Sequence, residues 1–377
     1  MTAPPRPVST VQVLLCGALI VTLSMGIRHG FGLWLQPVTQ TQGWTRQTFS
    51  LALALQNLSW GVIGVFAGML ADKLGAFRVL LAGAVLYALG LAGMGLAPTP
   101  MLFALTTGVL IGAAQAGTTY AVIYGVIGRQ IAPERRSWAM GVAAAAGSFG
   151  QFLMVPVEGQ LIARLGWQAA LLVLATLVLV VVPLAFGLRE PRRAAAASHR
   201  EQTIPQAVAE AFRYPSFMLL MAGYFVCGFQ VVFIGVHMPS YLRDKGLSPE
   251  VASYALALIG LFNVFGTYLA GALGARLAKR KLLAAIYLSR AAAIALFLVM
   301  PISPLTVYVF ASVMGFLWLS TVPLTSGIVA QIFGVAHFSM LGGFVFLSHQ
   351  VGSFLGVWLG GYLYDRTGSY DLVWYIA

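Results

Sequence analysis

Eleven long apolar runs dominate this sequence and limit what it can fold into. Because a helix needs about 20 mostly apolar residues to cross the hydrocarbon core, each run is long enough for one membrane span. Long continuous runs also exclude the short alternating strands of a membrane β-barrel. A twelfth run begins near Asp371 and stops at Ala377, so we expect a truncated twelfth helix. The eleven runs cover residues 11–37, 48–71, 78–97, 101–128, 138–163, 167–188, 216–241, 250–275, 282–300, 304–330 and 338–363.

The composition excludes a soluble protein. Charged residues make up 8% of the chain, whereas a soluble globular protein has about 25%. Two cysteines exclude a disulfide scaffold and a Cys-rich metal module. A net charge of +12 spread over 377 residues is too sparse for a nucleic-acid partner. We find no P-loop, no metal-ligand spacing and no nucleophile elbow, so we predict neither an enzyme nor a cofactor or metal site.

Lysine and arginine residues predict the orientation of the spans. With the N-terminus in the cytoplasm, fifteen of them fall in cytoplasmic loops and five in outer loops, and Arg28 and Arg290 remain inside spans. The positive-inside rule therefore predicts a cytoplasmic N-terminus and a cytoplasmic 189–215 loop, facing anionic lipid. The short loops, the Arg/Ala/Gly-rich composition and the lack of a cleavable signal peptide favour a bacterial inner membrane.

The longest polar stretch, 189–215, divides the chain into an N-terminal half of six spans (1–188) and a C-terminal half (216–377). Within this linker, PQAVAEAF predicts a short surface helix. Weak repeats relate the halves: GMLADKLGAFRVL (68–80) is similar to GALGARLAKRKLL (271–283), and GQLIARLGW (159–167) to GYLYDRTGS (361–369). Corresponding loops that look alike are typical of parallel repeats.

The loop after the second span resembles the signature loop between helices 2 and 3 of the major facilitator superfamily. This resemblance implies an all-α polytopic fold of two six-helix halves that rock about a site at the membrane midplane. It also implies that Gly68, Asp72, Lys73 and Arg78 form a conformational latch rather than a binding site. The matching residues are Gly68, Leu70, Ala71, Asp72, Lys73, Gly75 and Arg78.

The entry to the fifth span resembles the monocarboxylate porter branch of that superfamily, which implies a small organic anion as substrate. Three places depart from the expected patterns. In the eighth span, Asn263 and Thr267 stand where the branch has an aspartate and a substrate-binding arginine. In the fourth span, Gly108 stands where proton-driven antiporters have an arginine. The first span lacks the Gly/Trp-rich signature of the branch. The matching residues are Arg135, Arg136, Ala139, Gly141 and Gly150, followed by Gly166 and Trp167.

Ionisable residues inside spans are costly and are therefore candidates for function. Arg28 can bind a carboxylate with its planar fork, or it can extend to the outer interface. Arg290 can bind the anion too, although its helix is peripheral in this fold, which favours a structural role. Glu158 can carry a proton or neutralise Arg28, unless it lies at the outer interface.

Further polar side chains are candidates for the substrate site, each with a packing role as the alternative. His349 and Gln350 lie mid-span in the eleventh run, and a histidine can also transfer a proton. Tyr120 and Tyr124 are four residues apart, so they share a helix face and can orient an anion. Gln230 and Asn263 complete the expected site; Gln56, Asn57, Trp60, His29 and His237 are weaker candidates.

Two arginines and two histidines against one glutamate inside the spans favour an anionic substrate. We therefore predict a secondary transporter of a small organic anion, a monocarboxylate, that works as a monomer by alternating access with proton symport. An exporter of drugs or other amphipathic compounds is the first alternative, and the aromatic segment YFVCGFQVVF is compatible with it. A membrane receptor or structural protein is the second, and the latch motif and two-half plan argue against it.

Overall fold

The structure, a computed structural model, describes residues 9–189, 204–334 and 338–377, and these residues are all-helical, without strands. The elements of the first part are α1 (Thr10–His29), η1 (Phe31–Trp34), α2 (Leu35–Gln42), α3 (Arg46–Leu74), α4 (Ala76–Leu96), α5 (Pro100–Phe103), η2 (Ala104–Leu110), α6 (Ile111–Thr118), α7 (Tyr120–Gln130), α8 (Pro133–Leu165), α9 (Trp167–Leu177), η3 (Val178–Val180) and α10 (Val181–Phe186). Those of the second are α11 (Ile204–Arg213), α12 (Pro215–Asp244), α13 (Pro249–Gly274), α14 (Lys279–Val299), α15 (Pro304–Leu317), α16 (Thr321–Phe333), α17 (Phe338–Thr367) and α18 (Asp371–Ile376).

The described residues contain 11 helical segments long and apolar enough to cross a membrane. Each coincides with one predicted run. The largest difference is at the first, which extends to Gln42 because α2 continues the helix beyond the apolar run, through the polar segment LQPVTQTQ. The predicted surface helix is present as α11, and α18 occupies the start of the twelfth run.

Glycines form the sharp corners between spans. Gly166, between α8 and α9, has φ +78°, and Gly368, between α17 and α18, has φ +70°. These two glycines are equivalent in the repeats predicted from the sequence, so in both repeats a long helix ends at a glycine with positive φ. A left-handed φ is unfavourable for residues with a Cβ, which explains why the turn requires glycine at both places.

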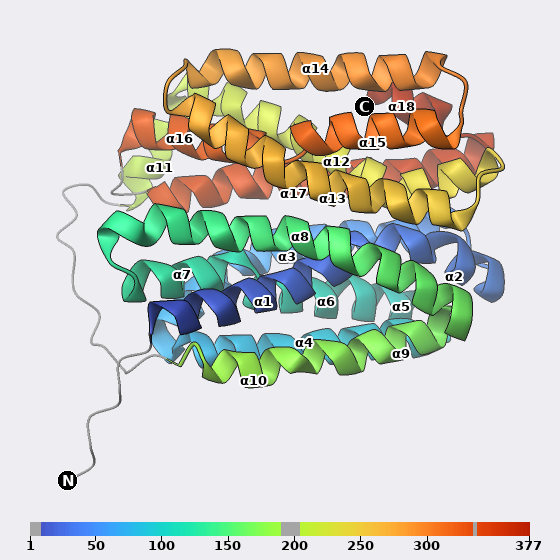
Figure 1. Cartoon of the computed structure of the whole chain (residues 1–377), viewed down its shortest axis with the longest axis horizontal. Coiled ribbons are helices and arrows are strands. Elements are labelled where there is room, and N and C mark those ends of the chain that lie inside the picture. Colours follow the sequence, from blue (N-terminus) through green and yellow to red (C-terminus); the bar gives the residue numbers. More distant parts are fainter. Residues whose placement is uncertain (1–8, 190–203, 335–337) are drawn as a thin grey trace, which may run out of the picture.

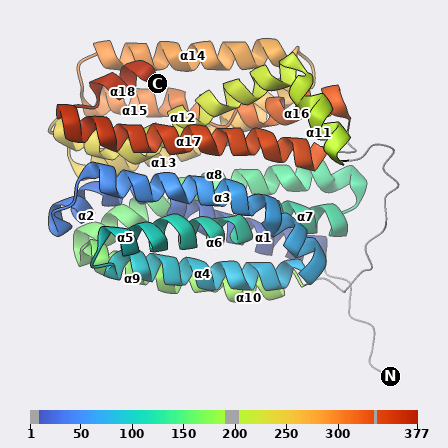
Figure 2. The ribbon, with the colours of Figure 1, turned by 180° about the vertical axis from the view of Figure 1, so that it is seen from behind.

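The helices form two groups, one of α1–α10 and one of α12–α18 (Figure 1). The groups meet along α8 and α13 on the face seen in Figure 1 and along α3 and α17 on the face seen in Figure 2. Helix α11 lies at one end of the bundle, which we call the linker end. Helix α2 lies at the opposite end, which we call the Arg46 end.

Besides the sixth span, in which the 3-10 turn η3 separates α9 from α10, three spans are interrupted along their length. The first breaks at Gly30, where α1 gives way to the tighter turns of η1, and the fourth breaks at Thr119, between α6 and α7. The tenth breaks at residues 318–320, between α15 and α16. Interrupted helices free backbone groups that must be satisfied inside the protein, and such breaks are common at transporter binding sites.

Candidate functional site

Arg28 lies two residues before the break in the first span and makes few polar contacts. Its Nη2 donates to Oδ1 of Asn57 on α3 at 2.6 Å, and its guanidinium lies over the ring of Trp60, 4.7 Å from the centroid. Its Nε is buried and has no acceptor. Among the described residues, no carboxylate forms an ion pair with Arg28. The side chain is therefore a half-buried cation without a counterion.

A row of aromatic rings runs from Arg28 into the second group of helices. Trp60 contacts Phe346 at 5.3 Å between centroids, and Phe346 stacks on His349 at 6.2 Å. His349 in turn contacts Tyr224 at 4.9 Å. These side chains come from α3, α17 and α12, so the row connects the two groups of helices at the level of Arg28.

His349 and Gln350 are adjacent on α17 but pack against different neighbours. Nδ1 of His349 is 3.1 Å from Oε1 of Gln350 and 3.4 Å from Oγ of Ser353. Gln350 is fully buried and packs against Gly61 of α3, and its Nε2 has no acceptor. His349 thus lies in the aromatic row, whereas Gln350 lies in the contact between α3 and α17.

Tyr120 and Tyr124 share a face of α7, as the spacing predicts, with ring centroids 5.5 Å apart. They follow the break in the fourth span directly. Tyr120 is near enough to Arg28 for an electrostatic interaction, and its hydroxyl lies against Gly147 of α8. Tyr120 therefore lies near both Arg28 and α8.

Arg290 has a different role from Arg28. Its Nε and Nη2 donate to the Leu317 carbonyl at 3.3 and 2.7 Å, and Nη2 also bonds the Trp318 carbonyl. Its Nη1 lies 3.2 Å from Sγ of Cys227. Its donors are thus occupied by the backbone at the break in the tenth span. The structure does not bring Arg290 to Arg28, and we leave it out of the anion site.

Asn263 also supports this break. Its Oδ1 accepts from the Leu319 N–H at 2.9 Å and from Thr267 Oγ1 at 3.0 Å, while its Nδ2 donates to Ser148 Oγ on α8 at 2.8 Å. The amide therefore connects α8, α13 and the tenth span. Gln230, the other expected amide, donates its Nε2 to the Ala377 carbonyl at 2.6 Å. Neither side chain has a recorded contact with Arg28.

Glu158 lies inside the first group of helices. Its side chain is fully buried, and neither carboxyl oxygen has a hydrogen-bond partner among the described residues. It packs against Gly30 at the break in the first span. Among the described residues the carboxyl makes no ion pair with Arg28, and the depth of Glu158 in the membrane stays a prediction.

The two groups of helices are closely packed at the Arg46 end and separate toward the linker end. A Cβ on Gly32 would approach the Val236 carbonyl oxygen to 2.9 Å, and one on Gly361 the Arg46 carbonyl oxygen to 2.7 Å. By contrast, Gly64 and Gly68, on the same face of α3 as Gly61, have nothing within 4 Å. Helices α3 and α17 therefore diverge from the level of Gln350 toward the linker end.

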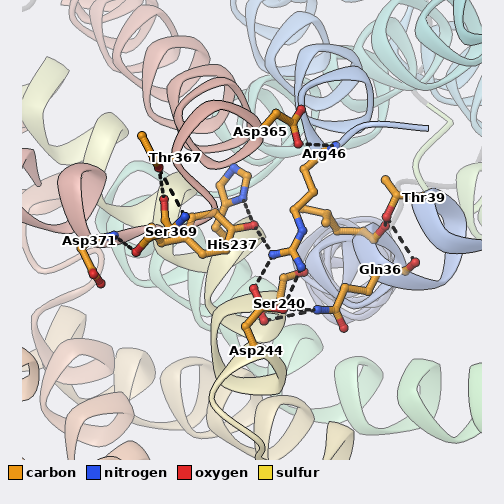
Figure 3. Close-up of polar contacts among 12 residues, drawn as sticks. Gln36, Thr39, Arg46, His237, Ser240, Asp244, Asp365, Thr367, Ser369 and Asp371 are labelled. Carbon is orange, nitrogen blue, oxygen red and sulfur yellow. Dashed lines mark hydrogen bonds and ion pairs between the residues drawn. The ribbon is translucent and has the colours of Figure 1, made fainter. Parts of the chain in front are cut away.

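Arg46 fastens the groups together at its end of the bundle (Figure 3). Its Nη1 and Nη2 donate to the two carboxylate oxygens of Asp244 at 2.6 and 2.7 Å, and Nη1 donates to the Tyr370 hydroxyl at 3.0 Å. The backbone N–H of Arg46 and of Gln47 donate to Asp365. Burial raises the pKa of Tyr370, so its phenol stays protonated at neutral pH. We call Arg46, Asp244, Asp365 and Tyr370 the Arg46 clamp.

The predicted latch lies at the linker end. Lys73 and Arg78 are exposed there, on either side of the Gly75 corner, whose φ is +87°. For Asp72 the structure describes the helical backbone, and its side chain lies outside the description. The role of these residues as a conformational latch stays a prediction.

Several side chains that the sequence did not single out, or that were weaker candidates, lie around Arg28 or in the Arg46 clamp. Asn57 and Trp60 were weaker candidates, and they are the neighbours of Arg28. Their spacing from Arg28 along the chain gives no signal, because helices α1 and α3 meet only in the folded bundle. Arg46 was assigned to an outer loop on charge alone, and its bidentate contact with Asp244 required a partner almost 200 residues away. Among the described residues, no group of His, Cys, Asp or Glu side chains could hold a metal ion.

Comparisons with known proteins agree with the fold. The family model of the Major Facilitator Superfamily matches residues 14–326. The chain is 24% identical over 358 residues to the uncharacterized MFS-type transporter YcxA of Bacillus subtilis, covering 92% of this chain and 86% of that one. It is 27% identical to monocarboxylate transporter 13 of Rattus norvegicus, covering 87% and 75%. It is 22% identical to the oxalate:formate antiporter of Oxalobacter formigenes, covering 94% and 85%.

A solved structure shows the same fold. It is the inward-facing, unoccupied form of a bacterial homologue of the human lysosomal transporter Spinster, with a TM-score of 0.75 and 18% identity. It covers 95% of this chain and 84% of its own. The all-helical bundle, its eleven spans and the match of the family model lead to one assignment: this chain is an integral membrane transporter that belongs to the Major Facilitator Superfamily.

Proposed function

We propose that this transporter moves a small organic anion, a monocarboxylate, by alternating access with proton symport. The observation that carries the proposal is the state of Arg28. Its guanidinium is half-buried in the bundle, bonds a neutral amide, and has a buried Nε without an acceptor. A carboxylate would supply both the missing acceptor and the opposite charge, and arginine binds carboxylates with two parallel hydrogen bonds.

Two relatives support this substrate class by their names. One is a monocarboxylate transporter, and the other exchanges oxalate and formate, which are both carboxylates. In this chain Asn263 stands where the branch has its aspartate, and it is occupied with structural bonds. We therefore place the anion at Arg28, in the first span, between the aromatic row and the tyrosines of α7.

The proposed orientation puts the linker end in the cytoplasm and the Arg46 end outside, in a bacterial plasma (inner) membrane. The predominance of basic residues in the linker-end loops supports it. In this orientation the separated helices face the cytoplasm, and the molecule is inward-facing. Because both groups of helices come from one chain, we propose a functional monomer. A carboxylate that enters with a proton moves less net charge, which favours proton symport; Glu158 and His349 are the candidate carriers.

The test of the anion site is carboxylate binding to variants of Arg28. Loss of a hydrogen bond to a charged group costs about 1.5–3 kcal/mol, so Arg28→Ala should weaken binding roughly 10- to 150-fold. Arg28→Lys should recover part of it, since an ammonium keeps the charge and loses the fork. The measurement is titration of the purified protein with lactate or formate, after each variant is shown to be folded.

His29→Gln is the matched control, because His29 is the next residue and its Nδ1 lies 2.6 Å from the Met25 carbonyl oxygen. It should leave the affinity within a few-fold. Unchanged affinity in Arg28→Ala would remove Arg28 from the site. The aromatic row favours one alternative, export of drugs or other amphipathic compounds. That alternative predicts extrusion of such a compound from vesicles by native protein and by Arg28→Ala alike.

A further inference from the structure

Glu158 is a buried acid that the packing of the bundle leaves without a partner. Its side chain is fully buried, and its two carboxyl oxygens lack hydrogen bonds among the described residues. A native protein seldom leaves a buried polar group unpaired, and each such group calls for a functional or structural explanation. Its position at the break in the first span suggests which explanation applies.

The carboxyl lies at the end of a ladder of close contacts between α1 and α8. Oγ1 of Thr22 donates to the Ala146 carbonyl at 3.0 Å. One turn on, Gly26 faces Gly150, whose carbonyl oxygen would lie 2.8 Å from an added Cβ. A further turn on, Gly30 faces the carboxyl of Glu158 itself. Glycine at position 30 creates the space that the carboxyl fills, so Glu158 packs directly against the backbone of α1.

A carboxylate in this place would be a buried charge without a counterion, which destabilises a folded protein strongly. The neutral carboxylic acid carries no such penalty. We propose that Glu158 is the proton-binding site of this transporter, and that the contact between Glu158 and Gly30 forms only when the carboxyl is protonated. The step is a simple protonation: the carboxylate takes one proton from a hydronium ion of the solvent, an O–H bond forms on the carboxyl, one O–H bond of the hydronium breaks, and water is released.

The position of Gly30 couples this proton to the substrate. Gly30 is the hinge between α1 and η1, and Arg28 is two residues before it. Release of the proton would force the carboxyl away from Gly30 and so move the segment that carries the guanidinium. This part of the inference rests on the proposed function, in which Arg28 binds the anion. The proton site itself does not depend on the nature of the substrate.

The titratable side chains on the neighbouring helices contact other groups or are exposed, so we assign the proton to Glu158. Helix α1 contributes Arg28 and His29, which bond Asn57 and the Met25 carbonyl instead. From α4, Tyr87 is near enough for an electrostatic interaction, and its hydroxyl donates to the Ser24 carbonyl at 3.0 Å. The other helices packed on α8 are α7, α9 and α13. Tyr120 of α7 lies near Gly147, α9 has no titratable residue, and α13 places Ser253 opposite Gly159 while its Glu250 is exposed.

The first experiment measures conformation without any substrate. Spin labels on cysteines at Thr41 and Lys245, with Cys16→Ala and Cys227→Ser, report the separation of the two groups at the Arg46 end. In the native background we expect the short distance at low pH and a growing population of longer distances as the pH rises. Glu158→Gln mimics the protonated acid and should keep the short distance at every pH. Glu158→Asp keeps a carboxyl, and should keep the pH response.

His349→Gln is the control for the alternative proton carrier, and its distances should change with pH as in the native background. A pH response that persists in Glu158→Gln, or one that His349→Gln abolishes, would overturn the assignment. So would distances in the native background that do not change with pH. Replacing sodium by choline should leave the response unchanged; dependence on sodium would mean that the site binds a metal cation instead.

The second experiment measures transport of radiolabelled lactate by protein in liposomes. Glu158→Gln should lose accumulation driven by a pH gradient and keep lactate exchange at equal pH on both sides. Arg28→Ala should lose both. If Glu158→Gln still accumulates lactate against its gradient, the proton site is wrong while the anion site stands. If the native protein moves no lactate, the proposed substrate is wrong, and the distance measurements still decide the proton site.

Discussion

At the scale of single residues, the two arginines inside spans differ in what surrounds them. Arg290 is fully buried, and four polar contacts to the break in the tenth span and to Cys227 occupy its donors. Arg28 is half-buried and has one hydrogen bond, to Asn57. The same residue type thus completes a helix break in one place and leaves an unsatisfied cation in the other.

Arg290→Met should therefore lower stability and leave anion affinity unchanged. The substitution leaves the carbonyls of Leu317 and Trp318 buried without donors, and each unpaired group costs about 1–3 kcal/mol. The measurements are the unfolding temperature in detergent and the titration used for Arg28. A variant of normal stability that no longer binds the carboxylate would place Arg290 in the substrate site after all.

At the scale of elements, closure at the Arg46 end depends on contacts of α3 with α12 and α17. Close glycine contacts set the distance between the helices, and the Arg46 clamp adds directional bonds at their ends (Figure 3). Arg46 holds Asp244 of α12 in a bidentate ion pair and also lies over the ring of Tyr364 of α17, 3.7 Å from its centroid. For the Arg46 end to open, this set of contacts has to break.

Asp244→Asn should shift the molecule toward the form that is open at the Arg46 end. The pair is partly exposed, with 12% and 28% of the two side chains accessible, so we expect an effect of ~1 kcal/mol, about fivefold in the ratio of the two forms. The distance between labels at Thr41 and Lys245 measures that ratio. Asp371→Asn removes an equal charge at the same end without touching Arg46, and it should leave the distances as they are. Equal shifts in both variants would assign the effect to net charge rather than to the clamp.

At the scale of the whole molecule, the two ends of the bundle differ in charge and in packing. The linker end carries the exposed Lys73, Arg78 and Arg213, and there the groups of helices separate; the Arg46 end is closely packed. If the linker end is cytoplasmic, as we propose, these two features correspond to an inward-facing form.

Cysteine labelling tests this orientation in intact cells. A cysteine at Ser198, in the linker, should resist a membrane-impermeant thiol reagent, whereas one at the exposed Thr41, at the Arg46 end, should react. Both variants need the Cys16→Ala and Cys227→Ser background. Because the predicted 189–215 loop is cytoplasmic, permeabilising the cells should make Ser198→Cys reactive as well. Labelling of Ser198→Cys in sealed cells would reverse the orientation.

The sequence alone predicted the spans, their order and the repeated turns, because these depend on local properties. A run of apolar residues is a membrane span wherever it packs, and the glycines at 166 and 368 are required by the backbone of the turn itself. The latch motif and the α11 helix could be recognised for the same reason. Their signals lie within segments of ten to thirty residues.

Tertiary structure decided which side chains make up the candidate site. The sequence pointed to Arg28, Arg290 and Glu158 as costly residues inside spans, and it ranked Asn57 and Trp60 low. Their roles follow from which helices meet: α1 meets α3 at Arg28, α1 meets α8 at Glu158, and the tenth span breaks beside Arg290. The cost of a buried polar group depends on its partners across the bundle, and partners a hundred residues apart leave no mark in the local pattern.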